Sequence, residues 1–147
     1  MDEMLGQTFL NHTTAVSLLL YIAWTMVLVT IIFGLRSYLV LSGKRRVNSF
    51  KADGQDVSAF AERLNRAHGN SVESFVFAGG LMLFTIATNN TAVTDGLAGY
   101  VVAARIAQSL CHLVSTSALM VQARFVFFLI QVVICIIWLM ELLTPLL

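Results

Sequence analysis

Residues 66–73 read RAHGNSVE, and residues 75–87 read FVFAGGLMLFTIA. The first stretch is polar and carries charges of both signs, whereas the second is almost purely apolar. A membrane-spanning helix needs about 20 predominantly apolar residues. The junction between these stretches therefore predicts a membrane helix over about residues 68–88 that opens with a polar cluster.

The composition indicates a membrane protein. The chain has 147 residues, of which 58% are hydrophobic and 12% are charged, and its mean hydropathy is +0.82. Soluble globular domains carry about 25% charged residues. The length fits one domain, residues 1–147, and the net charge of +1 gives no sign of a nucleic-acid partner. Cys111 and Cys135 lie in apolar surroundings without metal-ligand spacing, so we expect no metal site.

Four stretches are long and apolar enough to predict membrane helices. They cover about residues 15–40, 68–88, 96–118 and 124–143. The sequence thus predicts an all-α integral membrane protein built as a four-transmembrane-helix bundle. The chain begins with the acidic residues MDEML, whereas a signal peptide has a basic start, so we interpret the first apolar stretch as a retained helix.

The connectors between these helices differ in charge. Residues 89–96 contain no basic residue, whereas the connector over residues 42–66 contains Lys44, Arg45, Arg46, Lys51, Arg63 and Arg66. By the positive-inside rule, the 42–66 loop faces the cytoplasm and both termini lie on the other side. The bacterial inner membrane, the plasma membrane and the endoplasmic reticulum all remain open. Asp56 or Ser58 is placed to cap a helical approach to the second membrane helix.

A polar stripe opens the second predicted helix. At 3.6 residues per turn, Arg63, Arg66, Asn70 and Glu73 share one face, and His68 points to nearly the opposite side. The two arginines are also compatible with snorkelling at the interface, and Asn70 with hydrogen bonding between helices.

A second polar stripe runs along the third predicted helix. Its members follow i, i+3, i+4, i+7 and i+11 spacing: Arg105, Gln108, Ser109, His112 and Thr116. Inserting an arginine near the centre of a membrane helix costs roughly 2.5–3.5 kcal/mol, so Arg105 is expected to face a partner. Glu73 is the natural candidate to pair with Arg105 or with Arg66. Two such stripes in one small bundle favour a site for a polar, anionic ligand reached from the cytoplasmic side.

Residues 62–75, ERLNRAHGNSVESF, resemble the signature of the MAPEG family, the membrane-associated proteins in eicosanoid and glutathione metabolism. The family pattern, roughly E-R-x-x-R-A-x-x-N-x-x-E, is met by Glu62, Arg63, Arg66, Ala67, Asn70 and Glu73. Residues 100–113, YVVAARIAQSLCHL, resemble the family's third helix. The resemblance implies a homotrimer of four-helix bundles that binds glutathione between neighbouring subunits.

The resemblance also implies roles for individual residues. Those implied to hold glutathione are Arg66, Asn70, Glu73, Arg105, Gln108 and His112. The resemblance adds one basic residue of the loop, Lys44, Arg45 or Arg46, and we take Arg46 for that position. Arg124 looks like the family's arginine that stabilises the glutathione thiolate. The chemistry is sound, because a thiol with a pKa of about 8.5 is a poor nucleophile at neutral pH and a neighbouring guanidinium favours the thiolate. The alternative for Arg124 is a positive-inside anchor.

Three departures put the eicosanoid activities in doubt. Gly69 stands where prostaglandin-forming members carry an arginine, His112 replaces a tyrosine, and Phe128 stands where a tyrosine would follow Arg124 by one turn. The predicted function is therefore a glutathione transferase or peroxidase for a lipophilic small-molecule substrate that enters from the lipid bilayer. We expect the acceptor in a groove lined by Phe125 and Phe128. A non-catalytic lipid-binding or scaffold protein of the same fold, or a subunit of a transporter, remains the alternative.

Overall fold

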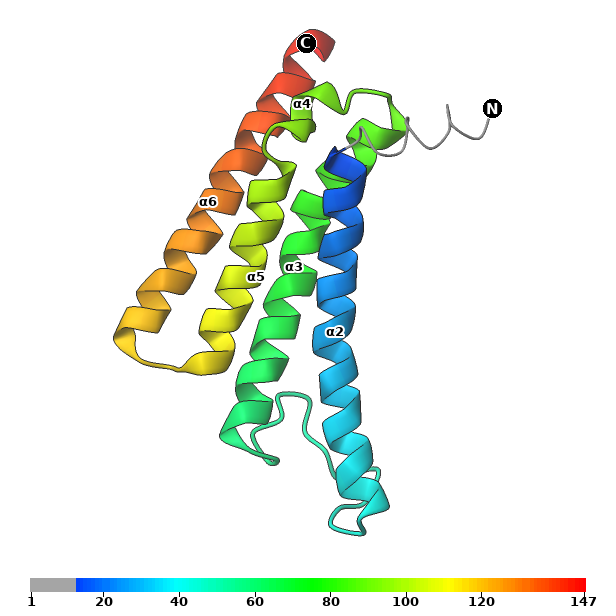
Figure 1. Ribbon diagram of the computed structural model, residues 1–147, viewed down its shortest axis with the longest axis vertical. Helices are drawn as coiled ribbons and strands as arrows, with labels where there is room; N and C mark the ends of the chain where they lie inside the picture. The colour runs from blue at the N-terminus through cyan, green and yellow to red at the C-terminus, as the bar shows by residue number, and fades with distance from the viewer. Residues whose placement is uncertain (1–12) are drawn as a thin grey trace.

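The computed structural model describes residues 13–147 as helices that lie side by side (Figure 1). Its elements are α2 (Thr13–Leu41), α3 (Ala59–Ala87), α4 (Ala92–Asp95), α5 (Ala98–Val114), α6 (Ala118–Leu143) and the 3-10 helix η1 (Thr144–Leu146). Over these described residues the chain is all-helical and contains no strand. The acidic start of the chain falls outside them.

The helices match the length and character of membrane spans. Thr13–Leu41, Ala59–Ala87 and Ala118–Leu146 are each long and apolar enough to cross a bilayer. The apolar helix α5 has 17 residues, slightly fewer than the usual length of about 20. Large apolar side chains point outward from the helices, including Phe33 at 71% and Val76 at 77% exposure. Since a bilayer solvates such a surface, the chain is an integral membrane protein.

The apolar core lies in the half of the bundle that holds the start of α2 and the ends of α3 and α6. Tyr21, Met82, Val101 and Trp138 are fully buried there, one from each long helix. A smaller cluster, built on Leu28, Leu64 and Ala67, lies nearer the other end. Because apolar packing is thinner in that half, polar side chains occupy part of the interior, and the candidate site forms among them.

Helix α3 begins at Ala59, so the predicted helical approach and the membrane helix predicted from residue 68 form one continuous helix. Ser58 has an extended backbone, and its Oγ accepts a hydrogen bond from Ala61 N at 3.0 Å, so Ser58 rather than Asp56 is the N-cap. Asp56 instead accepts from Arg45 Nη1 at 2.6 Å and from Lys51 N at 3.2 Å. The irregular loop therefore covers residues 42–58, and the arginine-rich approach to α3 is helical.

Helix α6 begins earlier than predicted, at Ala118 rather than residue 124. The Oγ of Ser117 accepts a hydrogen bond from Met120 N at 3.5 Å and caps the helix. The connector from α5 is therefore limited to residues 115–117. Arg124 consequently lies within the second turn of α6, where the helix restricts the direction of its side chain.

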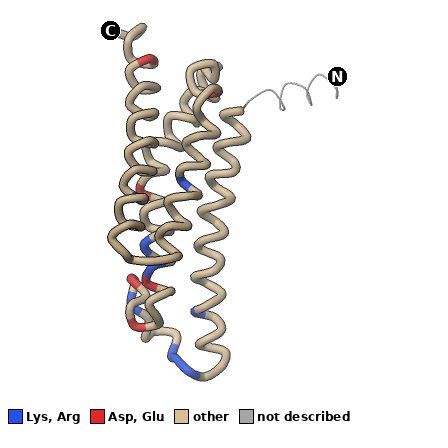
Figure 2. Tube along the Cα trace, turned by 60° about the vertical axis from the view of Figure 1, so that its left-hand side comes forward, with Lys and Arg blue, Asp and Glu red and all other residues tan. Residues whose placement is uncertain are grey.

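Charge is distributed unevenly along the bundle. Acidic residues occur at both ends of the described bundle, whereas lysines and arginines gather toward the end that carries the 42–58 loop and are not seen at the opposite end (Figure 2). This difference supports the proposal that the loop end faces the cytoplasm.

Two glycines in the 42–58 loop allow a direct test of its packing. Gly43 and Gly54 both have positive φ, +69° and +72°. A Cβ added at Gly54 would lie 2.5 Å from Asn65 Nδ2 and 3.1 Å from the backbone of Ala61. A Cβ added at Gly43 would meet nothing within 4 Å. We expect Gly54→Ala to lower the free energy of unfolding by about 2 kcal/mol and Gly43→Ala by about 1 kcal/mol. Denaturant titration in detergent measures both, and equal losses would contradict the packing of the loop against α3.

Candidate functional site

A basic pocket opens where the start of α3 meets the end of α5 and the start of α6. It has a volume of about 150 Å³ and is lined by Ala59, Glu62, Arg63, Arg66, His112, Thr116 and Arg124. The one carboxylate, on Glu62, pairs with Arg66 Nη2 at 2.6 Å. Two further guanidinium groups remain to offset a negative charge, so the pocket suits an anionic ligand.

Two arginines of the pocket are held by backbone carbonyls. Arg124 Nε donates to Met120 O at 3.2 Å, and Arg63 Nε donates to Leu113 O at 3.0 Å. Arg124 Nη1 also lies 2.9 Å from His112 Nδ1. Because a guanidinium has donors only, Nδ1 accepts this bond, which assigns the imidazole proton to Nε2. The geometry thus fixes one guanidinium and one neutral imidazole at the same wall.

A buried polar network lies one turn deeper. Arg105 is fully buried, and its Nη1 donates to Asn70 Oδ1 at 2.6 Å. Gln108 Nε2 donates to the same oxygen at 3.0 Å, and Gln131 Nε2 donates to Gln108 Oε1 at 2.9 Å. The Arg105 guanidinium lies 5.8 Å from the centre of the Tyr21 ring. The network therefore joins side chains of all the long helices, α2, α3, α5 and α6.

One family of known proteins matches this chain over most of its length. The model of the MAPEG family matches residues 14–144. The chain belongs to the MAPEG family. No curated protein and no solved structure matches it. Membership indicates a membrane protein of the type found in glutathione and eicosanoid metabolism, and the MAPEG match includes every residue of the pocket and of the buried network.

The predicted pairing of Glu73 with Arg105 or Arg66 is wrong in this MAPEG chain. Arg66 pairs with Glu62 one turn earlier, and Arg105 bonds to Asn70. Glu73 is exposed, and neither ion pair found among residues 13–147 includes it. The stripe on α3 is wide, so its members do not all face the same neighbouring helix. Asn70 faces α5, whereas Glu73 lies at the outer edge of α3.

The other predicted site residues divide into three groups. Arg66, His112 and Arg124 line the pocket, and Asn70, Arg105 and Gln108 form the network beneath it. Arg46 is exposed in the 42–58 loop and is not among the pocket residues. Of its neighbours, Arg45 pairs with Asp56 at 2.6 Å, whereas Lys44 lies over the Tyr38 ring at 5.3 Å. Helices position the first two groups, whereas the loop sets the place of the third.

The sequence patterns did not predict that Gln131 and Tyr21 belong to the buried network. Gln131 is fully buried, and it is the only amide side chain in the apolar α6 segment between Arg124 and Glu141. That isolation was a usable signal, because a polar group inside a membrane helix usually has a partner. Tyr21 offered no comparable pattern. Its hydroxyl donates to Ser71 O at 3.0 Å, a contact that depends on how α2 packs against α3.

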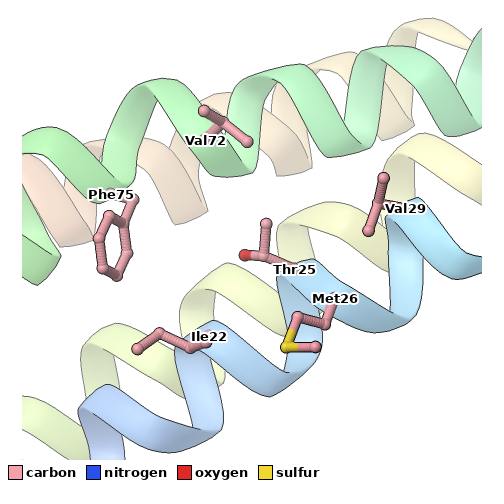
Figure 3. Close-up of a pocket in the computed structure, with 6 residues that line it drawn as sticks. All are labelled: Ile22, Thr25, Met26, Val29, Val72 and Phe75. Carbon is pink, nitrogen blue, oxygen red and sulfur yellow. The ribbon is translucent and has the colours of Figure 1, made fainter.

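Apolar pockets lie apart from the basic pocket. The groove between α2 and α3, of about 210 Å³, is lined by Ile22, Thr25, Met26, Val29, Val72 and Phe75 (Figure 3). A second pocket, between α3 and α6, has a volume of about 170 Å³. Neither contains Phe125 or Phe128, the predicted walls of an acceptor groove; Phe125 is 64% exposed at the start of α6.

The network gives a test of how the buried charge is stabilised. Asn70→Leu removes the oxygen that accepts from Arg105, and we expect it to lower the free energy of unfolding by about 3 kcal/mol, because it leaves a buried cation without this partner. Asn70→Asp keeps an oxygen there and adds a compensating charge, so its stability should equal or exceed that of the wild type. Titration with a denaturing detergent in mixed micelles measures both. Equal losses would show that Arg105 does not depend on this oxygen.

Proposed function

We propose that the protein is a glutathione-dependent transferase or peroxidase that acts on lipophilic electrophiles or hydroperoxides. The convergence of Arg66, His112 and Arg124 on one basic pocket carries the proposal. These residues come from three helices, and family membership makes glutathione the expected ligand. The cationic character of the pocket agrees with that ligand, because glutathione carries two carboxylates.

The side chains fit a tripeptide with a thiol. Arg63 and Arg66 bind its carboxylates, since a guanidinium presents paired donors to a carboxylate, and Arg66 exchanges its partner Glu62 for the ligand. Glu73, on the outer edge of the same helix, receives its ammonium group. Asn70, Arg105 and Gln108 support the pocket from beneath, where Arg105 Nε and Nη2 are buried without a hydrogen-bond partner among the described residues. Glutathione supplies a nucleophilic thiol when bound.

Arg124 activates that thiol. The bonds to Met120 O and His112 Nδ1 orient its guanidinium before any ligand arrives. A fixed cation favours the thiolate over the thiol, and it does so without reorganisation at the moment of reaction. His112 keeps its Nε2 proton and offers a second donor at the same wall.

A second copy of the chain completes the site. The pocket of about 150 Å³ is smaller than the roughly 300–1,000 Å³ of small-molecule sites, so one chain does not enclose a tripeptide. Arg66 and Glu73 are exposed on α3, and a carboxylate on a lipid-facing surface is costly. A neighbouring subunit that covers this face removes that cost. This arrangement, with α5 as the fourth membrane span, agrees with the homotrimer that the family resemblance implies.

Arg124 is the first residue to test. In purified protein titrated with glutathione, the wild type should show the ultraviolet absorbance of a bound thiolate, and Arg124→Ala should lose it while still binding the tripeptide. Arg124→Lys keeps a positive charge and should retain part of the signal. No binding at millimolar glutathione in the wild type would refute the proposal. Binding without a thiolate signal in the wild type would favour the non-catalytic alternative.

The role of Glu73 is tested by affinity. Glu73→Gln should weaken glutathione binding about ten-fold, since a hydrogen bond to a charged group contributes about 1.5 kcal/mol. Glu141→Gln, at the opposite end of the bundle, is the matched control and should bind as the wild type does. Isothermal titration in detergent gives both dissociation constants. An unchanged affinity in Glu73→Gln would remove this residue from the site.

A further inference from the structure

A larger groove lies away from the basic pocket, where the end of α2 meets the 42–58 loop. It has a volume of about 480 Å³ and is lined by Phe33, Arg36, Ser37, Val40, Leu41, Val47, Asn48 and Phe50. This volume falls within the roughly 300–1,000 Å³ of ligand sites. None of these residues belongs to the basic pocket or to the buried network, so the groove is a separate feature of the fold.

The groove is amphipathic along its length. Phe33, Leu41 and Val47 are 71%, 87% and 77% exposed, and such a set of bare apolar side chains is stable only against lipid or another apolar surface. Arg36, Ser37 and Asn48 supply polar groups in the same groove. Arg36 lies less than two turns before the end of α2, so its guanidinium reaches the boundary between hydrocarbon and headgroups.

The charge around the groove is positive. Residues 36–56 contain five basic residues and two acidic ones. One acid, Asp56, pairs with Arg45, and the other, Asp53, accepts a hydrogen bond from Gln55 N at 3.1 Å. Arg36 Nη2 donates to Lys51 O at 3.0 Å, and its guanidinium lies 5.6 Å from the centre of the Phe50 ring. The arginine is therefore oriented by the loop and by an aromatic wall, and no carboxylate neutralises it among its contacts.

We propose that this groove is a binding site for an anionic phospholipid of the leaflet at the basic end of the bundle. The phosphate contacts Arg36 and the polar groups of Ser37 and Asn48, while an acyl chain extends from it into the bilayer along Phe33. Arginine suits this role because its planar donors match phosphate oxygens. A zwitterionic lipid offers the same phosphate with a cationic group attached, which the excess of basic residues disfavours.

The test uses the purified full-length protein in nanodiscs that contain equal parts of phosphatidylglycerol and phosphatidylcholine with identical acyl chains. Lipids that stay bound after transfer to detergent are counted by native mass spectrometry. We expect phosphatidylglycerol to be enriched on the wild type and Arg36→Gln to reduce its retention about ten-fold, the loss expected for a hydrogen bond to a charged group. Lys51→Gln is the matched control, because it removes one positive charge from the loop that packs against Arg36, at a side chain that does not line the groove.

A second variant separates the site from the fold of the loop. Ser37→Met fills the groove from α2 without changing charge, so it should also reduce phosphatidylglycerol retention while circular dichroism and the thermal midpoint stay close to those of the wild type. Equal losses in Arg36→Gln and Lys51→Gln would overturn the proposal in favour of general attraction to a charged membrane. Retention of both lipids in equal amounts, or unchanged retention in Ser37→Met, would overturn it as well.

Discussion

The bond from Arg105 to Asn70 Oδ1 is the constraint on which the candidate site depends. A guanidinium buried in a membrane bundle has to be compensated locally, and here an amide oxygen and the face of an aromatic ring take the place of a carboxylate. Gln108 donates to the same oxygen, and Gln108 in turn accepts a hydrogen bond from Gln131. The spacing of α3, α5 and α6 is thereby set by polar bonds as well as by packing.

This network explains why the basic pocket lies where it does. Asn70 and Gln108 are each one helical turn from a pocket residue, Arg66 on α3 and His112 on α5. Because a helix is rigid, hydrogen bonds that fix one turn also fix the direction of the side chains on the next turn. Arg124 reaches the same wall from α6 because the short connector at residues 115–117 brings the start of that helix beside the end of α5.

The two ends of the bundle serve different purposes. Aromatic and aliphatic residues fill the half around Trp138 and Met82, which stabilises the fold. The polar network adjoins this core at Tyr21, and the other half has a small apolar cluster and the basic pocket. At its rim, the 42–58 loop adds exposed basic residues and an amphipathic groove. Apolar packing and the basic pocket are thus separated along the axis of the bundle.

The sequence by itself determined the membrane character, the family and the two polar stripes, because hydrophobic length and helical periodicity are local properties. Of the four membrane helices predicted, three are long enough to cross a bilayer, and α5 is shorter. The sequence also identified Arg66, His112 and Arg124, which the fold brings to one pocket. Only the tertiary structure decided that Asn70 rather than Glu73 partners Arg105, and that Gln131 and Tyr21 belong to the network. Those outcomes depend on how each helix is rotated against its neighbours, and helical spacing alone does not specify that rotation.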